Sequence, residues 1–177
     1  MGIWLVRHAF GLKSDHEIAA MNGAPEDPVL RYKIPRSVLV VIHTPDLQVL
    51  MMERAAWPGF WQSVTGSLDQ EDEPLREAAI REVREETGLD AGLYLLTDWN
   101  LSNHFDIFRR HQSRYAPGVT RNQEHIFSLE LPAPMDIVLS ADEHLQYRWL
   151  PWQEAARLTP SWTNRDAILA LPRRARA

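Results

Sequence analysis

The sequence predicts an α/β fold built around one β-sheet, and three observations support this expectation. The chain has 177 residues, of which 45% are hydrophobic and 24% charged, as expected for one globular domain with an ordinary core. Short β-branched or aromatic runs alternate with segments of helical periodicity, a pattern typical of helices packed on a sheet. There is no cysteine, which excludes disulfide scaffolds, thiolate zinc sites and cysteine nucleophiles.

An N-terminal arm of unknown role is predicted over residues 1–28, ahead of a domain over residues 29–177. The boundary is a run of turn formers and helix breakers at 22–28. Charged residues interrupt the apolar start of the arm and no small-residue cleavage pattern follows, which argues against a secretory signal.

The strands are expected to begin with a hairpin. Ser37–His43 is β-branched and apolar, Pro45-Asp46 makes a turn, and Gln48–Glu53 continues the strand pattern. A third strand is predicted over Phe60–Thr65, closed by Gly66. Later strands are predicted over Tyr94–Leu101, Glu124–Leu131 and Tyr147–Leu150.

The main helix is predicted over Glu73–Thr87. Asp72 is the expected N-cap, Pro74 lies in the first turn, where its missing N–H is harmless, and Gly88 follows the end. Two shorter helices are predicted over Trp152–Leu158 and Trp162–Leu169.

The net charge of −5 is concentrated in one segment. Between Gly66 and Asp90, nine acidic residues and three arginines give −6, which leaves +1 for the rest of the chain. Glu82 is three residues before Glu85 and four residues before Glu86, so a helix places the three carboxylates on one face. Carboxylate clusters suit Mg²⁺ or Mn²⁺, which often keep substrate phosphates as further ligands. A solvated acidic face is the alternative.

The segment from Gly66 to Leu89 closely resembles the Nudix box, the motif of the Nudix hydrolases. Six residues separate Gly66 from Glu73, and seven more precede the run Arg-Glu-Val-Arg-Glu-Glu-Thr-Gly-Leu from Arg81. The family pattern has five residues after the glycine, so one additional residue lies in the loop before the helix. The resemblance implies a Nudix-type α/β/α sandwich with a mixed β-sheet. It also implies Mg²⁺-dependent hydrolysis of a nucleoside diphosphate linked to another group.

The resemblance also implies roles for the acidic residues of the box. Glu82 and Glu86 match metal ligands, and Glu85 matches a neighbouring acid that binds or supports the metal cluster. Arg81 and Glu73 match a pair that orients the helix.

Other segments resemble the Nudix hydrolases that act on a pterin triphosphate, over about Tyr32 to Leu169. They are Phe60–Gly66, Arg114–Asn122 and Ser161–Arg165. This implies hydrolysis of 7,8-dihydroneopterin triphosphate to the monophosphate and pyrophosphate in folate biosynthesis. One alternative is a broader Nudix hydrolase of oxidised or noncanonical nucleoside triphosphates. Another, from a different class, is a non-catalytic Nudix-fold nucleotide-binding module.

This second resemblance implies site residues outside the box. Glu143 matches a third metal-binding acid, which could also accept a proton from the attacking water. A loop glutamate in solvent is its alternative. Cations are needed for the phosphate oxygens that the metal does not hold. The implied substrate contacts are Lys33, Arg54, Thr65, Phe105, Asp106, Ile107, Phe108 and Ser161.

The expected partner is therefore a pterin or nucleoside triphosphate. No nucleic acid is expected, because the charge of +1 outside the acidic segment shows no basic excess. No membrane is expected, because no apolar run approaches the roughly 20 residues of a span. The cytoplasm is the expected location. The seven histidines show no ligand spacing and are assigned no role.

Overall fold

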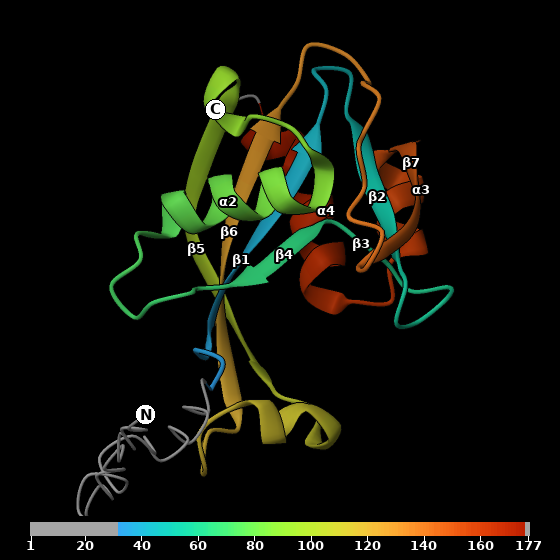
Figure 1. The fold of residues 1–177 in the computed structure, drawn as a ribbon. Helices are drawn as coiled ribbons and strands as arrows, with labels where there is room; N and C mark the ends of the chain where they lie inside the picture. Colours follow the sequence, from blue (N-terminus) through green and yellow to red (C-terminus); the bar gives the residue numbers. More distant parts are fainter. Residues whose placement is uncertain (1–31, 176–177) are drawn as a thin grey trace, which may run out of the picture. The chain divides into compact units, whose positions relative to one another are not determined.

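The computed structural model describes residues 32–175, which form a seven-stranded mixed sheet with helices on both faces (Figure 1). The strands are β1 (Arg36–His43), β2 (Gln48–Arg54), β3 (Trp61–Gln62), β4 (Val64–Ser67), β5 (Leu95–Asp106), β6 (Arg121–Glu130) and β7 (His144–Pro151). The helices are α2 (Leu75–Thr87), α3 (Trp152–Leu158) and α4 (Trp162–Arg174), with 3₁₀ turns η1 (Ala91–Leu93) and η2 (Arg109–Arg114). The predicted mixed α/β architecture is confirmed.

Strand β1 lies at the centre of the sheet. It pairs in parallel with β6 along its whole length and antiparallel with β4. Its pairing with β2 is limited to one position, His43 with Val49, because β4 occupies the same edge of β1 from Ser37 to Val40. The predicted hairpin is therefore present only at its turn, and each of its strands finds its main partner elsewhere.

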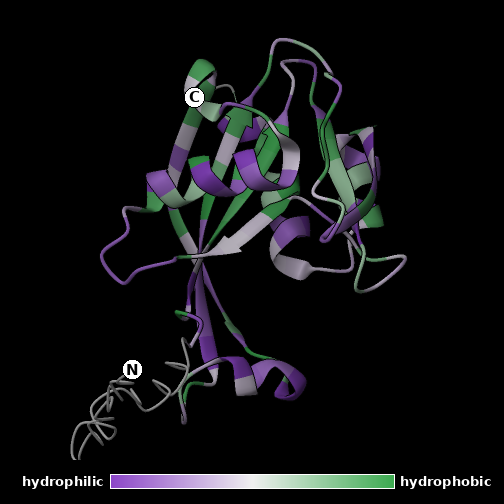
Figure 2. Ribbon diagram, in the orientation of Figure 1, coloured by the Kyte–Doolittle hydropathy of each residue, from purple (hydrophilic) through white to green (hydrophobic). Residues whose placement is uncertain are grey.

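Alternation along β1 sends its side chains into two cores. Val38 and Val40 pack on the side of α2, whereas Leu39 and Val41 pack on the side of α3 and α4. Burial on both faces explains the continuous apolar run in the sequence, which Figure 2 shows as green central strands. The helix residues in these cores include Ala78, Ala79 and Val83 of α2 and Ala167, Ile168 and Leu171 of α4.

The bounds of several predicted elements were wrong, and β5, β6, β7 and α4 are all longer than predicted. Helix α2 has Pro74 as its N-cap instead of Asp72, and no side chain caps it. Gly88 closes this helix with φ of 71°, as predicted. The strand predicted over Phe60–Thr65 is divided at Ser63, because β3 pairs with β2 and β4 pairs with β1.

Two further expectations concern the chain as a whole. Across residues 32–175, no helix is long and apolar enough to cross a membrane. The arm predicted over residues 1–28 lies outside the described residues.

Candidate active site

Burial divides the three glutamates of helix α2. Glu86 is fully buried and Glu82 is 8% exposed, whereas the side chain of Glu85 is 53% exposed. Glu82 and Glu86, one helical turn apart, therefore lie on the inner side of the helix. Glu85 is at the surface, where an oxygen lies 3.4 Å from Arg81 Nη1.

Both carboxylate oxygens of Glu86 have a partner. The backbone N–H of Thr65 on β4 donates to Oε1 at 3.1 Å, and the Nε2 atom of His144 lies 2.7 Å from Oε2. Burial raises the pKa of Glu86, and the hydrogen bond with His144 opposes this rise. Thr65 thus meets the acidic helix through its backbone.

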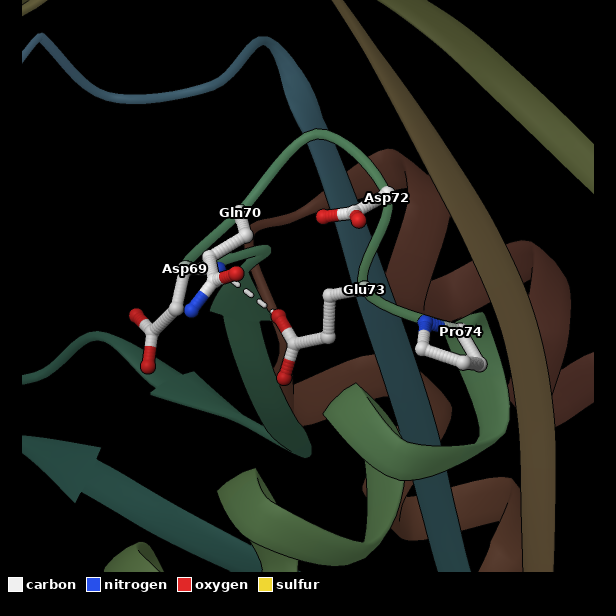
Figure 3. A pocket seen from close by; sticks show the side chains of 5 residues that line it. All are labelled: Asp69, Gln70, Asp72, Glu73 and Pro74. Atoms are coloured by element: carbon white, nitrogen blue, oxygen red, sulfur yellow. Dashed lines mark hydrogen bonds between the residues drawn. The ribbon is translucent and has the colours of Figure 1, made fainter.

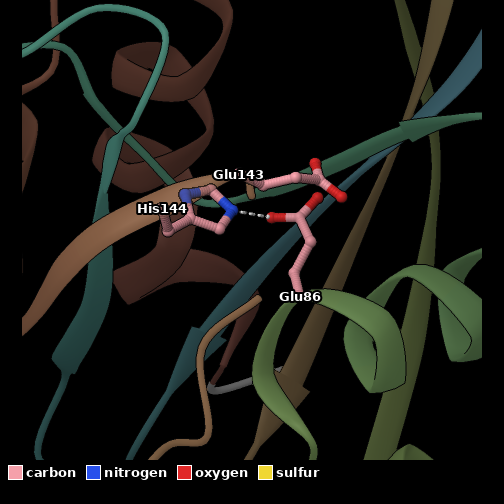
Figure 4. A group of neighbouring side chains, drawn as sticks. All are labelled: Glu86, Glu143 and His144. Carbon is pink, nitrogen blue, oxygen red and sulfur yellow. Dashed lines mark hydrogen bonds and ion pairs between the residues drawn. The ribbon is translucent and has the colours of Figure 1, made fainter. Parts of the chain in front are cut away.

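Glu143 and His144 approach Glu86 from the start of β7 (Figure 4). Ligand atoms of the three side chains lie within 4.8 Å of one another, close enough to hold one metal ion. Glu143 is exposed, and its carbonyl accepts a hydrogen bond from Ala55 N at 2.8 Å. The structure thus brings Glu143, a predicted metal ligand, beside Glu86, whereas His144 was not predicted.

Gly66 leaves space for the carboxylate of Glu82. A Cβ atom built at Gly66 would lie 1.7 Å from Cδ of Glu82 and about as close to its two oxygens. No side chain fits there, so Gly66 takes the place of the glycine of the box despite the additional residue. The insertion is therefore confined to the loop that follows β4.

That loop forms a pocket of its own at the start of α2 (Figure 3). Its lining does not include the buried carboxylates of Glu82 and Glu86. The N–H of Asp69 donates to Glu73 at 2.7 Å, which folds the loop back on itself. The lining residues are Asp69, Gln70, Asp72, Glu73 and Pro74.

Arg81 connects this loop to helix α2 and strand β4. Its guanidinium lies 3.0 Å from Glu73 Oε1 and 2.7 Å from Glu82 Oε1, and it donates to the carbonyl of Ser67 at 3.0 Å. The expected pair of Arg81 and Glu73 is formed. Burial raises the pKa of Glu82 to about 7, and Arg81 limits that rise. The inner face of α2 therefore favours a compensating cation.

Several basic residues lie near these carboxylates. Lys33 has an exposed side chain, and its N–H donates to the carbonyl of Arg114 at 2.8 Å. The pKa of the Lys33 ammonium is lowered, first by loss of hydration and then by the charge of Arg114. Glu82 and Glu143 act in the opposite sense, so Lys33 feels both the basic residues and the acidic cluster.

Lys33, Arg54, Arg110 and Arg114 are called the basic group below. Arg54 and Arg110 both contact the ring of Trp57. The guanidinium of Arg54 lies 5.4 Å from the ring centre of Trp57, and that of Arg110 lies 4.2 Å from the same ring. The ring of His111 is 5.3 Å from Trp57. Loss of hydration lowers the pKa of His111, with Arg110 adding to the effect. Trp57, Arg110 and Arg114 were not predicted as site residues.

The predicted stretch 105–108 is divided by the structure. Ile107 is buried, and its N–H donates to the carbonyl of Thr120 at 2.7 Å. Asp106 is exposed and pairs with Arg121 at 3.5 Å. Phe105 is half-buried on β5, and exposed Phe108 lies 5.3 Å from Arg110. Of the four residues, Phe108 is the one whose side chain contacts the basic group, through Arg110.

Ser161 lies at the N-cap of α4, on the opposite face of the sheet from α2. Its Oγ accepts a hydrogen bond from Asn164 N at 3.4 Å. Asn164 in turn accepts from the N–H of Ser63 at 2.7 Å. Ser161 thus lies on the α4 side of the sheet, whereas Glu82 and Glu86 belong to α2 on the other side.

The donor set of the site fits a hard divalent cation. Carboxylate oxygens are the preferred ligands of such ions, and a neutral histidine nitrogen is an acceptable one. Burial raises the pKa values of Glu82 and Glu86, and their contacts with Arg81 and His144 only partly oppose this rise. Glu86, Glu143 and His144, with Glu82 beside them, form the candidate metal centre.

Known proteins resemble both this architecture and this sequence. Dihydroneopterin triphosphate diphosphatase of Escherichia coli strain K12 is 50% identical over 140 residues, which cover 77% of this chain and 91% of that protein. The enzyme of the same name from Haemophilus influenzae is 41% identical over 143 residues, 79% of this chain and 89% of that protein. The solved structure of the E. coli dihydroneopterin triphosphate pyrophosphohydrolase matches with a TM-score of 0.71 and 50% identity, covering 77% of this chain and 94% of that one. Residues 33–171 match the NUDIX domain, so the chain belongs to the NUDIX family.

Proposed function

We propose that this protein hydrolyses 7,8-dihydroneopterin triphosphate to the monophosphate and pyrophosphate. The observation that carries the proposal is the 50% identity with an E. coli enzyme named for this substrate, over 77% of the chain. The site supports it, because buried carboxylates lie beside a group of cations suited to a triphosphate. Folate biosynthesis is then the pathway that the reaction serves.

We propose Glu82, Glu86 and Glu143 as the ligands of Mg²⁺, with Mn²⁺ as a substitute and His144 beside them. When bound, the ion supplies neutralisation of phosphate charge and a lowered pKa for the attacking water. Thr65 N–H fixes one oxygen of Glu86 at 3.1 Å, and Arg81 holds Glu82 at 2.7 Å. These hydrogen bonds orient the ligands before the substrate arrives.

The other residues of the site act on the substrate and on the proton. Lys33 and Arg54 bind the phosphate oxygens. Glu143 is an exposed carboxylate of the metal centre and Glu85 is an exposed carboxylate on the helix that carries Glu82 and Glu86, and we propose that one of the two accepts a proton from the attacking water. The catalytic set that we propose is Glu82, Glu85, Glu86 and Glu143. The proposed substrate contacts are those of the sequence prediction, namely Lys33, Arg54, Thr65, residues 105–108 and Ser161.

The wider assignments follow from this reaction. A small triphosphate is the proposed partner, with neither nucleic acid nor membrane required for turnover. The cytoplasm is the proposed location, which agrees with a chain that has no cysteine. We place the hydrolase domain over residues 29–177, within which the family match spans 33–171.

A product assay tests the proposal. The purified protein is given dihydroneopterin triphosphate, dATP, 8-oxo-dGTP or ADP-ribose with Mg²⁺, and the specificity constant and released phosphates are measured. We expect the highest specificity constant for the pterin substrate, with pyrophosphate as the product. A clearly higher value for 8-oxo-dGTP or dATP would favour the broader nucleotide hydrolase. Absence of turnover on all four would favour the non-catalytic binding module.

A further inference from the structure

A cluster of polar side chains, called the polar group below, lies under the first turn of α4, on the face of the sheet opposite to α2. It includes Glu124 and Asn122 of β6 and, at the start of α4, Ser161 and Thr163. Glu124 of β6 is paired with Ser37 of β1, and Asn122 is two residues earlier on the same strand, so both face the same way. Glu124 is 5% exposed and Asn122 is 3% exposed. The next residue on this face, Ile126, packs in the core with α4.

Hydrogen bonds connect this group to α4. The hydroxyl of Thr163 bonds to the carboxyl of Glu124, and Thr163 Oγ1 lies 3.1 Å from Ser161 Oγ. The amide of Asn122 donates to Ser37 Oγ at 2.7 Å. Ser161, a predicted substrate contact, therefore belongs to the same polar group as Glu124.

Two oxygens of the group have no partner among the described residues. They are Glu124 Oε2 and Asn122 Oδ1, and each is buried. The amide oxygen of Asn122 and the oxygens of an ionised Glu124 can only accept hydrogen bonds. Buried acceptors without donors cost free energy, and a ligand that supplies donors removes this cost. The group therefore needs a ligand with several N–H or O–H groups on one edge.

No cation of the described chain neutralises Glu124. The ion pairs of residues 32–175 do not include it. Burial raises the pKa of Glu124 to about 7, opposed by the hydrogen bond of Thr163. A ligand with a row of N–H donors would favour the ionised carboxylate.

We propose that Glu124 is the residue that recognises the pterin ring of the substrate. The inference rests on the proposed function and names the residue that selects the ring. A pterin carries a ring N–H beside an exocyclic amino group, so one edge presents two parallel donors. A carboxylate accepts both at once, one on each oxygen. Asn122 Oδ1 offers a further acceptor on the same face of the sheet.

Strand β4 links this ring site to the metal centre. Thr65 is paired with Leu39, whose side chain packs on the α4 side, so the Thr65 side chain faces that side as well. Its backbone N–H meanwhile binds Glu86 of the metal centre. A substrate that passes Thr65 can place its triphosphate at Glu86 and its ring toward Glu124.

The first turn of α4 is the entrance to the ring site. Thr163 in this turn bonds to Glu124, while Trp162 in the same turn is 44% exposed. Asn164 joins the turn to Ser63 through a hydrogen bond of 2.7 Å. Because Glu124 is only 5% exposed, entry of a ring would require this turn to move away from the sheet.

The test compares three triphosphates in the variant Glu124→Gln. Dihydroneopterin triphosphate and dGTP both present an amino group beside a ring N–H, whereas dATP presents an amino group beside a ring acceptor. Glutamine keeps the size of glutamate but replaces one acceptor with a donor. We expect kcat/KM to fall about a hundredfold for the first two and to change less than about threefold for dATP. Glu130→Gln, a half-buried glutamate on the same strand, should leave all three values within about twofold.

Binding of neopterin, which carries no phosphate, gives a readout that does not depend on turnover. Its affinity, followed by its own fluorescence, should be lost in Glu124→Gln and retained in Glu143→Gln, which alters only the metal side. A melting curve of each variant confirms folding. Glu124→Asp keeps the charge and should retain part of the preference for pterin, which provides a second folded variant.

The possible outcomes separate this inference from the proposed function. An equal loss for all three triphosphates would assign Glu124 a structural role, and unchanged values for all three would remove it from the site. The proposed function fails instead if the unmodified protein prefers dATP or 8-oxo-dGTP to the pterin substrate. In that case the effect of Glu124→Gln on the ratio of kcat/KM for dGTP to kcat/KM for dATP still shows whether Glu124 binds the amino group and ring N–H of the base.

Discussion

At the scale of single residues, Glu86 shows how surroundings assign a role to a carboxylate. It is fully buried and is held by Thr65 N–H and His144. Glu86→Gln keeps the size and an oxygen that can accept from Thr65 N–H, but it removes the charge that binds a cation. We expect kcat to fall at least about a thousandfold while the protein stays folded, because metal-dependent chemistry needs that ligand. Steady-state kinetics and a melting curve measure the two effects.

Glu77→Gln is the matched control for this change. Glu77 lies in the first turn of the same helix and is exposed. It should leave kcat within about twofold, since surface substitutions away from a site have small effects. Near-normal turnover in Glu86→Gln at saturating Mg²⁺ would disprove the metal assignment.

Glu82 makes metal binding depend on pH. Its pKa is raised to about 7, first by burial, so below that pH the carboxyl holds a proton that must leave before a cation binds. We expect the half-saturating Mg²⁺ concentration to rise as pH falls through 7, by at most about tenfold per unit for one proton. Activity titrations with Mg²⁺ at pH 6 and pH 8 measure this shift. Equal values at the two pH values would contradict it.

The sequence identified some of these residues and not others, for a physical reason. Glu82 and Glu86 share one helix, so their spacing alone brings them together. His144 and Glu124 come from strands far along the chain, and only the folded sheet places them beside Glu86 and α4. Nothing in a single sequence distinguishes Glu124 from an exposed strand glutamate, because its burial depends on the packing of α4.

At the scale of elements, the fit of α2 against β4 depends on one missing side chain. In Gly66→Ala, the new methyl group would lie 1.7 Å from Glu82 Cδ, so the carboxylate or the strand must move. We expect kcat/KM to fall at least about a hundredfold, because a ligand displaced by an ångström no longer fits its site. The cost in unfolding free energy should be about 1–3 kcal/mol, as for other overpacked positions.

Gly92→Ala is the comparison for this variant. Gly92 lies on the exposed turn η1, where a Cβ atom would approach only Asp90 Oδ1, at 3.1 Å. Activity should stay within about twofold there. Should Gly66→Ala retain full activity, the contact between β4 and Glu82 has no part in catalysis.

The elements themselves were mostly predictable, whereas their partners were not. Hydrophobic patterns located β1, β2 and α2 to within a few residues. The turn after His43 predicted that β1 and β2 pair as a hairpin. A pattern of buried residues does not show which strands lie side by side, and β1 pairs mainly with β6. The start of α2 was also missed, since Glu73 binds Arg81 and Asp69 N–H and so holds the loop before Pro74 in a non-helical path.

At the scale of the whole molecule, buried acids contribute to the pH dependence of stability. Burial is the main cause of the raised pKa values of Glu82, Glu86 and Glu124. These carboxyls therefore bind more protons in the folded than in the unfolded state between about pH 4.5 and pH 7, and without a divalent cation they lower the unfolding free energy as pH rises. The lowered pKa values of His43, His111 and His125 act in the opposite sense. Melting temperatures in EDTA at pH 5.5 and pH 7.5, compared between the unmodified protein and a variant that lacks one carboxyl, isolate the contribution of the acids.

Two additions to this experiment locate the effect. Mg²⁺ should raise the melting temperature more at pH 7.5 than at pH 5.5, because the ionised carboxylates bind it. Glu124→Gln should reduce the fall with pH, since one of the buried acids is removed. An identical change of melting temperature between pH 5.5 and pH 7.5 in Glu124→Gln and in the unmodified protein would contradict the assignment of this burial effect.

The alternation of side chains along β4 allows the residues near the proposed ring site to be changed separately from those near the metal centre. Val64 packs in the core with α2 and Gly66 faces Glu82, whereas Thr65 and Ser67 share the other side of the strand with Leu39 and Ser37. A library of variants restricted to the second side, together with Glu124, would change which ring is accepted and leave the hydrolytic face intact. A single strand thus allows new substrates to be selected one side at a time, without rebuilding the metal centre.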